Sequence, residues 1–212
     1  METNTTAAST LEDLKKCIIN IDRKSVQQII PGIIDSHDVP EILTGAVYPA
    51  LNHVREIYQQ RKTAIPEVLM SLSIVSNIIE SISKKSPMQQ RNQSILLGVI
   101  EGDTHDMGKN IIRDVYKGYG FSVTDLGKNV TVEKFVETAA LEKPSVVGLS
   151  SMMSTTVDKI GQAIEALKKE VPETKIMVGG AFMNPDLASQ LKADGYAVSA
   201  ATLIEETDIL LS

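Results

Sequence analysis

The sequence of 212 residues has one cysteine, no tryptophan and only 4% aromatic residues. A single thiol, Cys17, forms neither an intrachain disulfide nor a thiolate metal cage. Proteins of oxidising compartments that depend on disulfides are therefore excluded, and the chain fits a reducing compartment.

Long apolar runs and clustered positive charge are also missing. No continuous apolar run reaches the roughly 18 residues that a membrane span needs, and the polar N-terminus lacks the features of a signal peptide. The formal net charge of -6 argues against nucleic acid as a partner, because a phosphate-binding surface needs a basic patch. The densest basic segments, 55–62 and 168–169, are typical of solvated helix faces. We therefore expect a cytoplasmic protein that binds neither nucleic acid nor membrane.

What the sequence does contain is an ordinary globular composition, with 42% apolar and 23% charged residues.

Helical periodicity covers its N-terminal part. A first helix begins at Thr10, and a second, over 24–34, should be broken or kinked by Pro31. A third begins after Asp38, and a fourth near Ile65. Apolar stripes along the last two predict a helix bundle. The stripes are Leu43, Val47, Leu51, Val54 and Tyr58, then Val68, Leu72, Val75, Ile79 and Ile82.

The helical part is separated from the rest by a polar stretch. Residues 84–94 show no periodicity and contain Pro87, which is typical of a linker. We predict a helical domain over 1–88, a linker over 89–94 and a second domain over 95–212.

In the second domain, apolar or β-branched runs alternate with helical runs. Five such βα units specify a parallel sheet covered by helices on both faces. With right-handed crossovers the result is a flavodoxin-like (Rossmann-like) α/β domain of strand order 2-1-3-4-5, whose switch point lies between strands 1 and 3. The predicted strands are Ile95–Ile100, Phe121–Leu126, Ser145–Leu149, Lys175–Val178 and Tyr196–Val198.

The turn after the first predicted strand reads GDTHDMGKN, from Gly102 to Asn110. Ligands bind at this edge of open α/β sheets. An imidazole with a carboxylate two residues before it suits a metal, because one ring nitrogen binds the metal while the other donates its proton to the carboxylate. Gly108 leaves room for a bulky ligand beside the backbone. The alternative is that Asp103 caps the following helix and His105 is a solvated loop residue.

Two further turns on the same edge are unusual. The third strand is followed by a loop rich in hydroxyl groups, Ser150–Thr156, which faces the His105 turn across the switch point. Ser154 or Thr155 alternatively caps the next helix, whereas Ser150 is too early to do so and is available to a ligand or to Asp103. After the fourth strand, Gly179 and Gly180 permit a very close approach to the backbone, although a tight turn explains one of them.

These three motifs in this order, D-x-H-x-x-G, S-x-(L/M) and G-G, resemble the cobalamin-binding domain. That domain occurs in cobalamin-dependent methionine synthase, in adenosylcobalamin mutases and in corrinoid proteins of methyltransferase systems. The likeness covers roughly residues 90–212, and the N-terminal helices resemble the helical cap domain of the same family. The resemblance implies a cobalamin whose own benzimidazole base is displaced from cobalt by a histidine.

Transferred to this sequence, the resemblance makes His105 the lower ligand of cobalt and Asp103 the group that holds its other ring nitrogen. Gly108 would make room for the corrin and its nucleotide tail. The remaining residues are implied as neighbours of the tail (Ser150, Met152), of the corrin edge (Thr155, Thr156), of the benzimidazole (Gly179, Gly180) and of the upper face of cobalt (Tyr58, Ile65, Val68).

The sequence departs from the family pattern at four positions. Arg55 and Arg61 stand where small residues are usual in the cap. Asn129 and Thr131 replace the acidic residue and the proline usual after the second strand. These differences bear on how the cap docks, and none of them touches the expected cobalt ligand.

The resemblance implies a carrier that shuttles a methyl group on cobalt, which cycles between cob(I)alamin and methylcob(III)alamin. Its partners would be a substrate-specific methyltransferase, an acceptor-side methyltransferase and a reductive activase, since the chain has no catalytic barrel of its own. Two other classes compete: the small subunit of an adenosylcobalamin mutase and a cobalamin-based sensor. The helical part disfavours the first, and the lack of a basic or signalling module disfavours the second.

Overall fold

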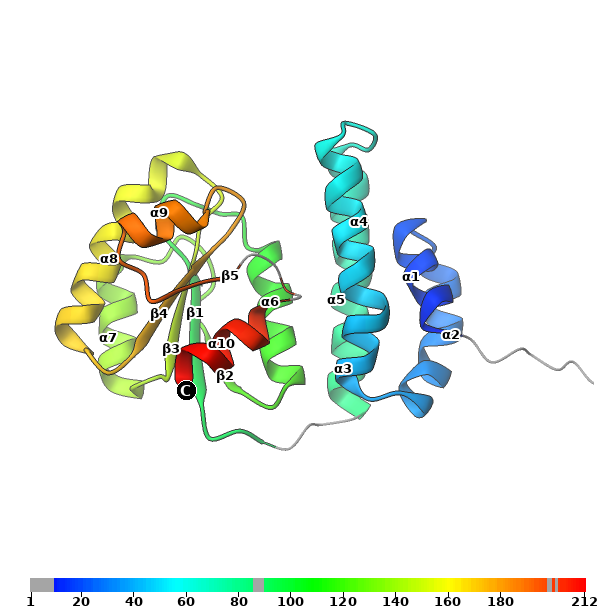
Figure 1. Cartoon of the computed structure of the whole chain (residues 1–212), viewed down its shortest axis with the longest axis horizontal. Coiled ribbons are helices and arrows are strands. Elements are labelled where there is room, and N and C mark those ends of the chain that lie inside the picture. The colour runs from blue at the N-terminus through cyan, green and yellow to red at the C-terminus, as the bar shows by residue number, and fades with distance from the viewer. Residues whose placement is uncertain (1–9, 86–89, 198–199, 201) are drawn as a thin grey trace, which may run out of the picture. The chain divides into compact units, whose positions relative to one another are not determined.

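The computed structural model describes residues 10–85, 90–197, 200 and 202–212. The chain divides into two compact units, Met1–Met88 and Gln89–Ser212, which are helical and α/β respectively (Figure 1). The expected fold class, a helical N-terminal part followed by a flavodoxin-like domain, is therefore confirmed. Residues 86–88, at the end of the predicted helical domain, and residue 89 of the predicted linker lie outside the described residues.

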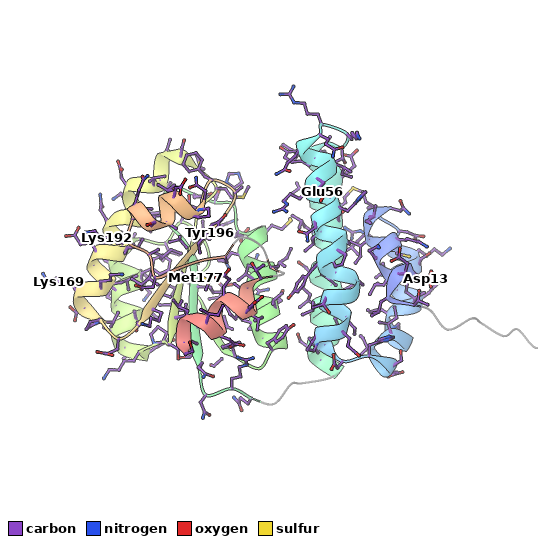
Figure 2. All side chains as sticks on the ribbon, in the orientation of Figure 1. Asp13, Glu56, Lys169, Met177, Lys192 and Tyr196 are labelled. Atoms are coloured by element: carbon purple, nitrogen blue, oxygen red, sulfur yellow. The ribbon has the colours of Figure 1, made fainter. Side chains whose placement is uncertain are left out.

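Side-chain caps define where the helices of the N-terminal unit begin. Thr10 and Asp13 (labelled in Figure 2) form a capping box, and Asp38 and Glu41 form a second one. The helices are α1 (Leu11–Ile19), α2 (Arg23–Ser36), α3 (Val39–Ile42), a π-helical turn η1 (Leu43–Val47), α4 (Tyr48–Gln59) and α5 (Ile65–Lys85).

The break expected at Pro31 does not occur, because α2 continues through it to Ser36. Proline removes one hydrogen-bond donor from the helix interior, which disfavours the helix locally. Burial of Ile30, Ile33 and Ile34 on either side of Pro31 opposes that cost, so that packing decides the outcome.

The expected third helix is interrupted by the π-helical turn. The Tyr48 amide bonds to the Leu43 carbonyl five residues back. Pro49 follows directly, and its ring would crowd the carbonyl of Gly45 in a regular α-helix. Gly45 also lies against α1, where an added Cβ would come 2.7 Å from Leu11 Cδ1. The wider turn accommodates the proline, and the glycine permits the close packing.

One helix meets the length and hydropathy criteria for a membrane span, although the sequence contains no continuous apolar run of that length. Ile65–Lys84 of α5 is long and apolar enough to cross a membrane by length and composition. Mostly buried core helices of ordinary proteins meet the same criteria; in α5, 33% of this window is buried, and the helix packs against α1, α2 and α4. Its buried residues include Ile74, Val75, Ile78, Ile79 and Ile82.

The α/β unit is built on a five-stranded, all-parallel sheet of order β2-β1-β3-β4-β5, which confirms the expected topology. The fifth strand was expected to include Val198, which lies outside the described residues. The strands are β1 (Ser94–Val99), β2 (Ser122–Asp125), β3 (Val146–Ser150), β4 (Lys175–Gly179) and β5 (Gly195–Ala197). The helices are α6 (Met107–Gly118), α7 (Val132–Glu142), the 3-10 turn η2 (Ser154–Thr156), α8 (Val157–Glu170), α9 (Pro185–Gln190) and α10 (Leu203–Leu211).

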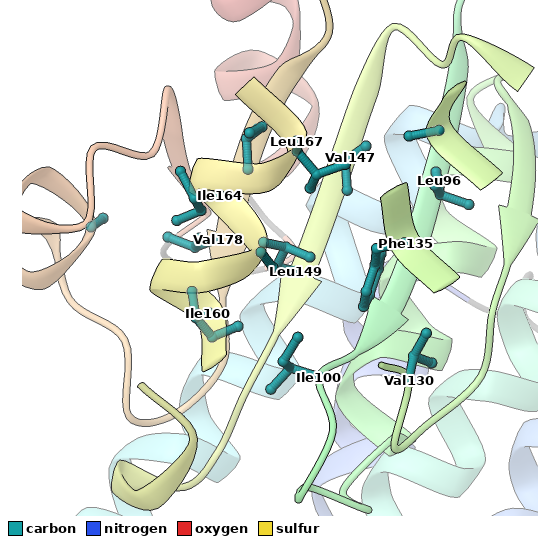
Figure 3. Packing of buried hydrophobic residues seen from close by; sticks show 14 of the residues in the cluster. Leu96, Ile100, Val130, Phe135, Val147, Leu149, Ile160, Ile164, Leu167 and Val178 are labelled. Carbon is teal, nitrogen blue, oxygen red and sulfur yellow. The ribbon is translucent and has the colours of Figure 1, made fainter. Parts of the chain in front are cut away.

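Helices cover both faces of this sheet. On one face, α7 and α8 pack over the strands, and Phe135 lies at the centre of the cluster drawn in Figure 3. Gly98 of β1 accommodates that ring, since an added Cβ would come 2.5 Å from Phe135 Cζ. On the other face, α6 and α10 are joined by a buried hydrogen bond of 2.7 Å between the Tyr116 and Thr207 hydroxyls.

The register of the three central strands brings their ends together. Val99 of β1 pairs with Ser150 of β3, which pairs with Gly179 of β4. The three turns that follow these residues therefore lie next to one another at the carboxyl edge of the sheet. That edge carries the motifs singled out from the sequence.

Candidate functional site

The site is built around a direct contact between Asp103 and His105. Asp103 Oδ1 lies 2.7 Å from His105 Nδ1 and accepts the His105 backbone amide at 2.9 Å. Because the carboxylate occupies Nδ1, the ring has Nε2 available for a ligand. The side chain of His105 is 56% exposed, whereas that of Asp103 is fully buried. A fixed imidazole thus presents one nitrogen at the edge of the sheet.

The Asp103 carboxylate stays ionised despite its burial. Burial by itself raises its pKa, but hydrogen bonds from the Met152 amide, at 2.6 Å to Oδ2, and from the His105 amide and ring lower it. The balance places the pKa of Asp103 below its ordinary value. An ionised carboxylate accepts a hydrogen bond from Nδ1–H, which favours the tautomer whose Nε2 lone pair is free.

Of the alternative considered from the sequence, the cap by Asp103 is not realised, whereas His105 is indeed an exposed loop residue. The N-cap of α6 is Asp106 rather than Asp103, and it makes no side-chain capping bond. Asp103 instead joins the turn after β1 to the turn after β3 through Met152. This bond spans the switch point, and it comes from a backbone amide rather than from the Ser150 hydroxyl considered from the sequence.

Apart from the half-buried Ser150, the hydroxyl groups of the loop after β3 form a buried pair and an exposed pair. Ser151 Oγ and Thr156 Oγ1 lie 2.6 Å apart and are buried, and both bond to the Met153 carbonyl. Ser154 and Thr155 are exposed, and α8 begins without a side-chain capping bond. Thr156 therefore shapes the loop, while Thr155 faces outward, as a contact with a ligand requires.

The three glycines of the motifs have different roles. Around Gly108 nothing lies within 4 Å of an added Cβ, so the space beside it is open. Gly179 is close only to Ala197, whose carbonyl lies 3.7 Å from such a Cβ. At Gly180, φ is +116° and an added Cβ would come 1.9 Å from the Ser151 carbonyl oxygen. Gly180 is thus required by the protein's own packing, whatever else it contacts.

The turn after β4 is also fixed from the neighbouring strand. The Tyr196 hydroxyl of β5 donates to the Met183 carbonyl at 3.0 Å, and Tyr196 is labelled in Figure 2. The turn after β3 exposes the apolar side chain of Met152 (45%), and the turn after β4 exposes that of Phe182 (42%). Phe182 was not among the residues predicted from the sequence, although its place two residues after Gly180 was a usable signal.

In the helical unit, the predicted apolar residues lie at one end of the helix pair. Tyr58 ends α4 with 44% exposure, Ile65 begins α5 with 58% exposure, and Val68 is half-buried. Leu69 and Met70, which the sequence analysis did not select, are each 43% exposed. Neither residue belongs to the apolar stripe of α5 that predicts the bundle, and this could be seen in the sequence. This end of the unit therefore exposes apolar side chains to solvent, beside charged residues such as Arg61 and Lys62.

The donor set decides which kind of metal fits. Among the residues described, no three His, Cys, Asp or Glu side chains gather as a metal site. One imidazole binds a metal firmly only when other ligands, such as a macrocycle, already hold it. His105 with open space at Gly108 therefore fits the cobalt of a corrin ring and does not fit a bare ion.

The fold and the site together define a flavodoxin-like domain with an exposed imidazole and open space at the carboxyl edge of its sheet, as in proteins that bind a large cofactor there. Comparison with known families agrees with that class. A B12 binding domain family matches residues 93–207, and a second family of the same description matches residues 10–82. The chain belongs to the B12 binding domain family, and it binds cobalamin or a related corrinoid.

Similar proteins cover nearly the whole chain. Dimethylamine corrinoid protein 2 of Methanosarcina acetivorans is 30% identical over 206 residues, which are 95% of this chain and 95% of that protein. A corrinoid protein of Desulfitobacterium hafniense is also 30% identical, over 96% of this chain and 98% of its own length. The fold is similar to the structure of the Methanosarcina barkeri monomethylamine corrinoid protein, with a TM-score of 0.75 and 23% identity over 93% and 95% of the two chains. The chain is thus a corrinoid protein homologous to the methylamine corrinoid proteins.

Proposed function

We propose that this protein carries a methyl group on the cobalt of a bound corrinoid between partner methyltransferases in the cytoplasm. The observation that carries the proposal is the buried, ionised Asp103 that holds Nδ1 of the exposed His105. The relatives support the role, since dimethylamine corrinoid proteins are similar over 95% of this chain. Helical and α/β parts both match, which disfavours a mutase subunit built on the α/β part alone.

The residues at the sheet edge have distinct parts in the proposal. His105 Nε2 would ligate the cobalt of the bound corrinoid, and Asp103 would orient the ring through its hydrogen bond to Nδ1. The bound corrinoid supplies a cobalt centre that accepts and releases a methyl group. Open space at Gly108 leaves room for the corrin and its tail. The other residues proposed to contact the cofactor are Ser150, Met152, Thr155, Thr156, Gly179 and Gly180.

The exposed apolar end of the helical unit is proposed to shield the upper face of the corrin. Tyr58, Ile65 and Val68 carry this role, and the exposure of Leu69 and Met70 extends the same surface. Apolar groups exclude water from the cobalt–carbon bond, as reactive centres require. The surface must also yield to partners, because transfer of the methyl group takes place on the same face.

The carrier role is tested by dependence on partners. Reduced, cobalamin-loaded protein is mixed with dimethylamine, monomethylamine or methanol, and methylation is followed by its absorption spectrum. We expect methylation only after a substrate-specific methyltransferase is added, and loss of the methyl group only after an acceptor-side methyltransferase is added. A reductive activase should return protein whose cobalt has been oxidised to its reduced, methyl-accepting state. Methylation by the protein and donor alone would contradict the carrier role.

The shielding surface is tested in the full-length protein by replacing Tyr58 and Ile65 together with serine. Both side chains are largely exposed, so the bundle should keep its stability. We expect bound methylcobalamin to lose its methyl group several-fold faster in light, because the bond is less enclosed. The matched control is Leu141→Ser, which changes a leucine of α7 that is 83% exposed. Equal photolysis rates in the double variant, the control and the unchanged protein would show that Tyr58 and Ile65 do not cover the cobalt.

A further inference from the structure

The turn that carries Asp103 and His105 is hydrogen-bonded to Asn129, one of the residues at which the sequence departs from the family pattern. The Asn129 side chain accepts the Gly102 amide through Oδ1 at 2.8 Å. The Asn129 backbone amide donates to the Asp103 carbonyl at 3.1 Å. Asn129 thus binds the chain on both sides of the Gly102–Asp103 peptide, directly before the carboxylate that orients His105.

The backbone of Asn129 makes this double contact possible. Its φ is +54°, in the left-handed region that asparagine adopts more readily than most other residues. In that conformation the side chain and the backbone amide both reach the turn after β1. An acidic residue is usual at this place in the family, and asparagine keeps the oxygen acceptor without adding a charge beside Asp103.

The loop that carries Asn129 is itself anchored at both ends. At its start, Lys109 Nζ lies 2.6 Å from both carboxylate oxygens of Asp125, and Asp125 Oδ1 also accepts the Gly127 amide at 2.8 Å. Lys109 is buried, so water screens this ion pair little. At its end, Val130 pairs with Ile100 beyond the last residue of β1. The loop is therefore held in one conformation and can support the turn after β1.

We propose that Asn129 is a positioning residue for the Asp103–His105 pair. By fixing Gly102 and the Asp103 carbonyl, it holds the carboxylate where it meets both His105 Nδ1 and the Met152 amide. The exposed side chain of Asn129 contributes little to overall stability, so its main effect is on where His105 Nε2 points. This inference rests on the proposed ligation of cobalt by His105.

The test compares Asn129→Gly with Asn129→Asp in the full-length protein. Glycine adopts the left-handed backbone but removes the Oδ1 acceptor, whereas aspartate keeps both. Proteins loaded with cob(II)alamin are studied by EPR with nitrogen-15-labelled histidine, which reports the fraction with histidine on cobalt. We expect histidine affinity to fall about 10-fold in Asn129→Gly, as for outer partners of metal-ligating histidines, and to stay near its original value in Asn129→Asp.

Two controls separate the possible failures. Lys143→Gly changes another left-handed residue, the C-cap of α7 at the opposite edge of the sheet, and should leave the EPR spectrum unchanged. His105→Ala, measured in parallel, should remove the histidine splitting altogether. If His105→Ala has no effect, the proposed ligand is wrong. If it removes the splitting but Asn129→Gly behaves like Lys143→Gly, the ligand stands and the positioning role of Asn129 is overturned. In the apo protein, NMR of the labelled His105 ring checks that Asn129→Gly weakens the Asp103–His105 hydrogen bond while the fold is kept.

Discussion

Replacing His105 with alanine is expected to abolish the superhyperfine splitting by histidine nitrogen in the EPR spectrum of bound cob(II)alamin. The reason is that Nε2 is the one nitrogen of the Asp103–His105 pair left free, since Nδ1 lies 2.7 Å from Asp103. The measurement compares protein labelled with nitrogen-15 histidine and unlabelled protein. His53 is the internal control, because it is exposed on α4 and its replacement by alanine should change nothing.

Asp103→Asn provides a graded version of the same test. Asparagine keeps the size of the side chain but removes the negative charge that holds the Nδ1 proton. Outer partners of this kind contribute about 10–100-fold to metal affinity or activity. We expect the histidine splitting to persist in a smaller fraction of the protein. Retention of full splitting in both His105→Ala and Asp103→Asn would place the cobalt ligand elsewhere.

Gly180→Ala is expected to destabilise the protein by about 2–6 kcal/mol, the sum of a strained backbone and an overpacked contact. The added Cβ would come 1.9 Å from the Ser151 carbonyl oxygen, at a φ of +116° that side chains disfavour. Backbone atoms cannot move aside as the end of a side chain can, so the turns after β3 and β4 must separate. Urea unfolding of the apo protein measures the loss.

The matched control is Gly108→Ala, at another of the three glycines that the sequence singled out. Nothing lies within 4 Å of that Cβ, and Gly108 is the second residue of α6. Alanine should therefore stabilise the apo protein by roughly 0.5–1 kcal/mol, because it favours the helix. At the same time it should weaken cobalamin binding, because the open space is proposed to hold the ligand. Equal unfolding free energies of Gly180→Ala and the unchanged protein would contradict the packing described here.

Much of this architecture was readable from local patterns. Thr10 and Asp38 predicted the starts of α1 and α3, because capping depends on residues within one turn. Alternating strands and helices predicted the order 2-1-3-4-5, since handedness leaves few arrangements of five βα units. Pro31 shows the limit of such reasoning, because burial of its neighbours overrides a local preference that favours a break.

Part of the candidate site could likewise be predicted from the sequence, and part could not. The sequence by itself determined that Asp103 and His105 come directly after β1, close enough for the carboxylate to reach the ring. It also determined that a second chemically unusual loop meets that turn, because parallel strands end at one edge.

Only the tertiary structure decided which groups meet across that edge. Met152 supplies a backbone amide to Asp103, Gly180 accommodates the Ser151 carbonyl, and Asn129 holds the turn from the far side. Each of these contacts joins residues distant along the chain, and at least one of the two partners is a backbone atom that every residue type has. Their partners therefore follow from strand register and loop conformation, and no residue pattern in the sequence encodes them.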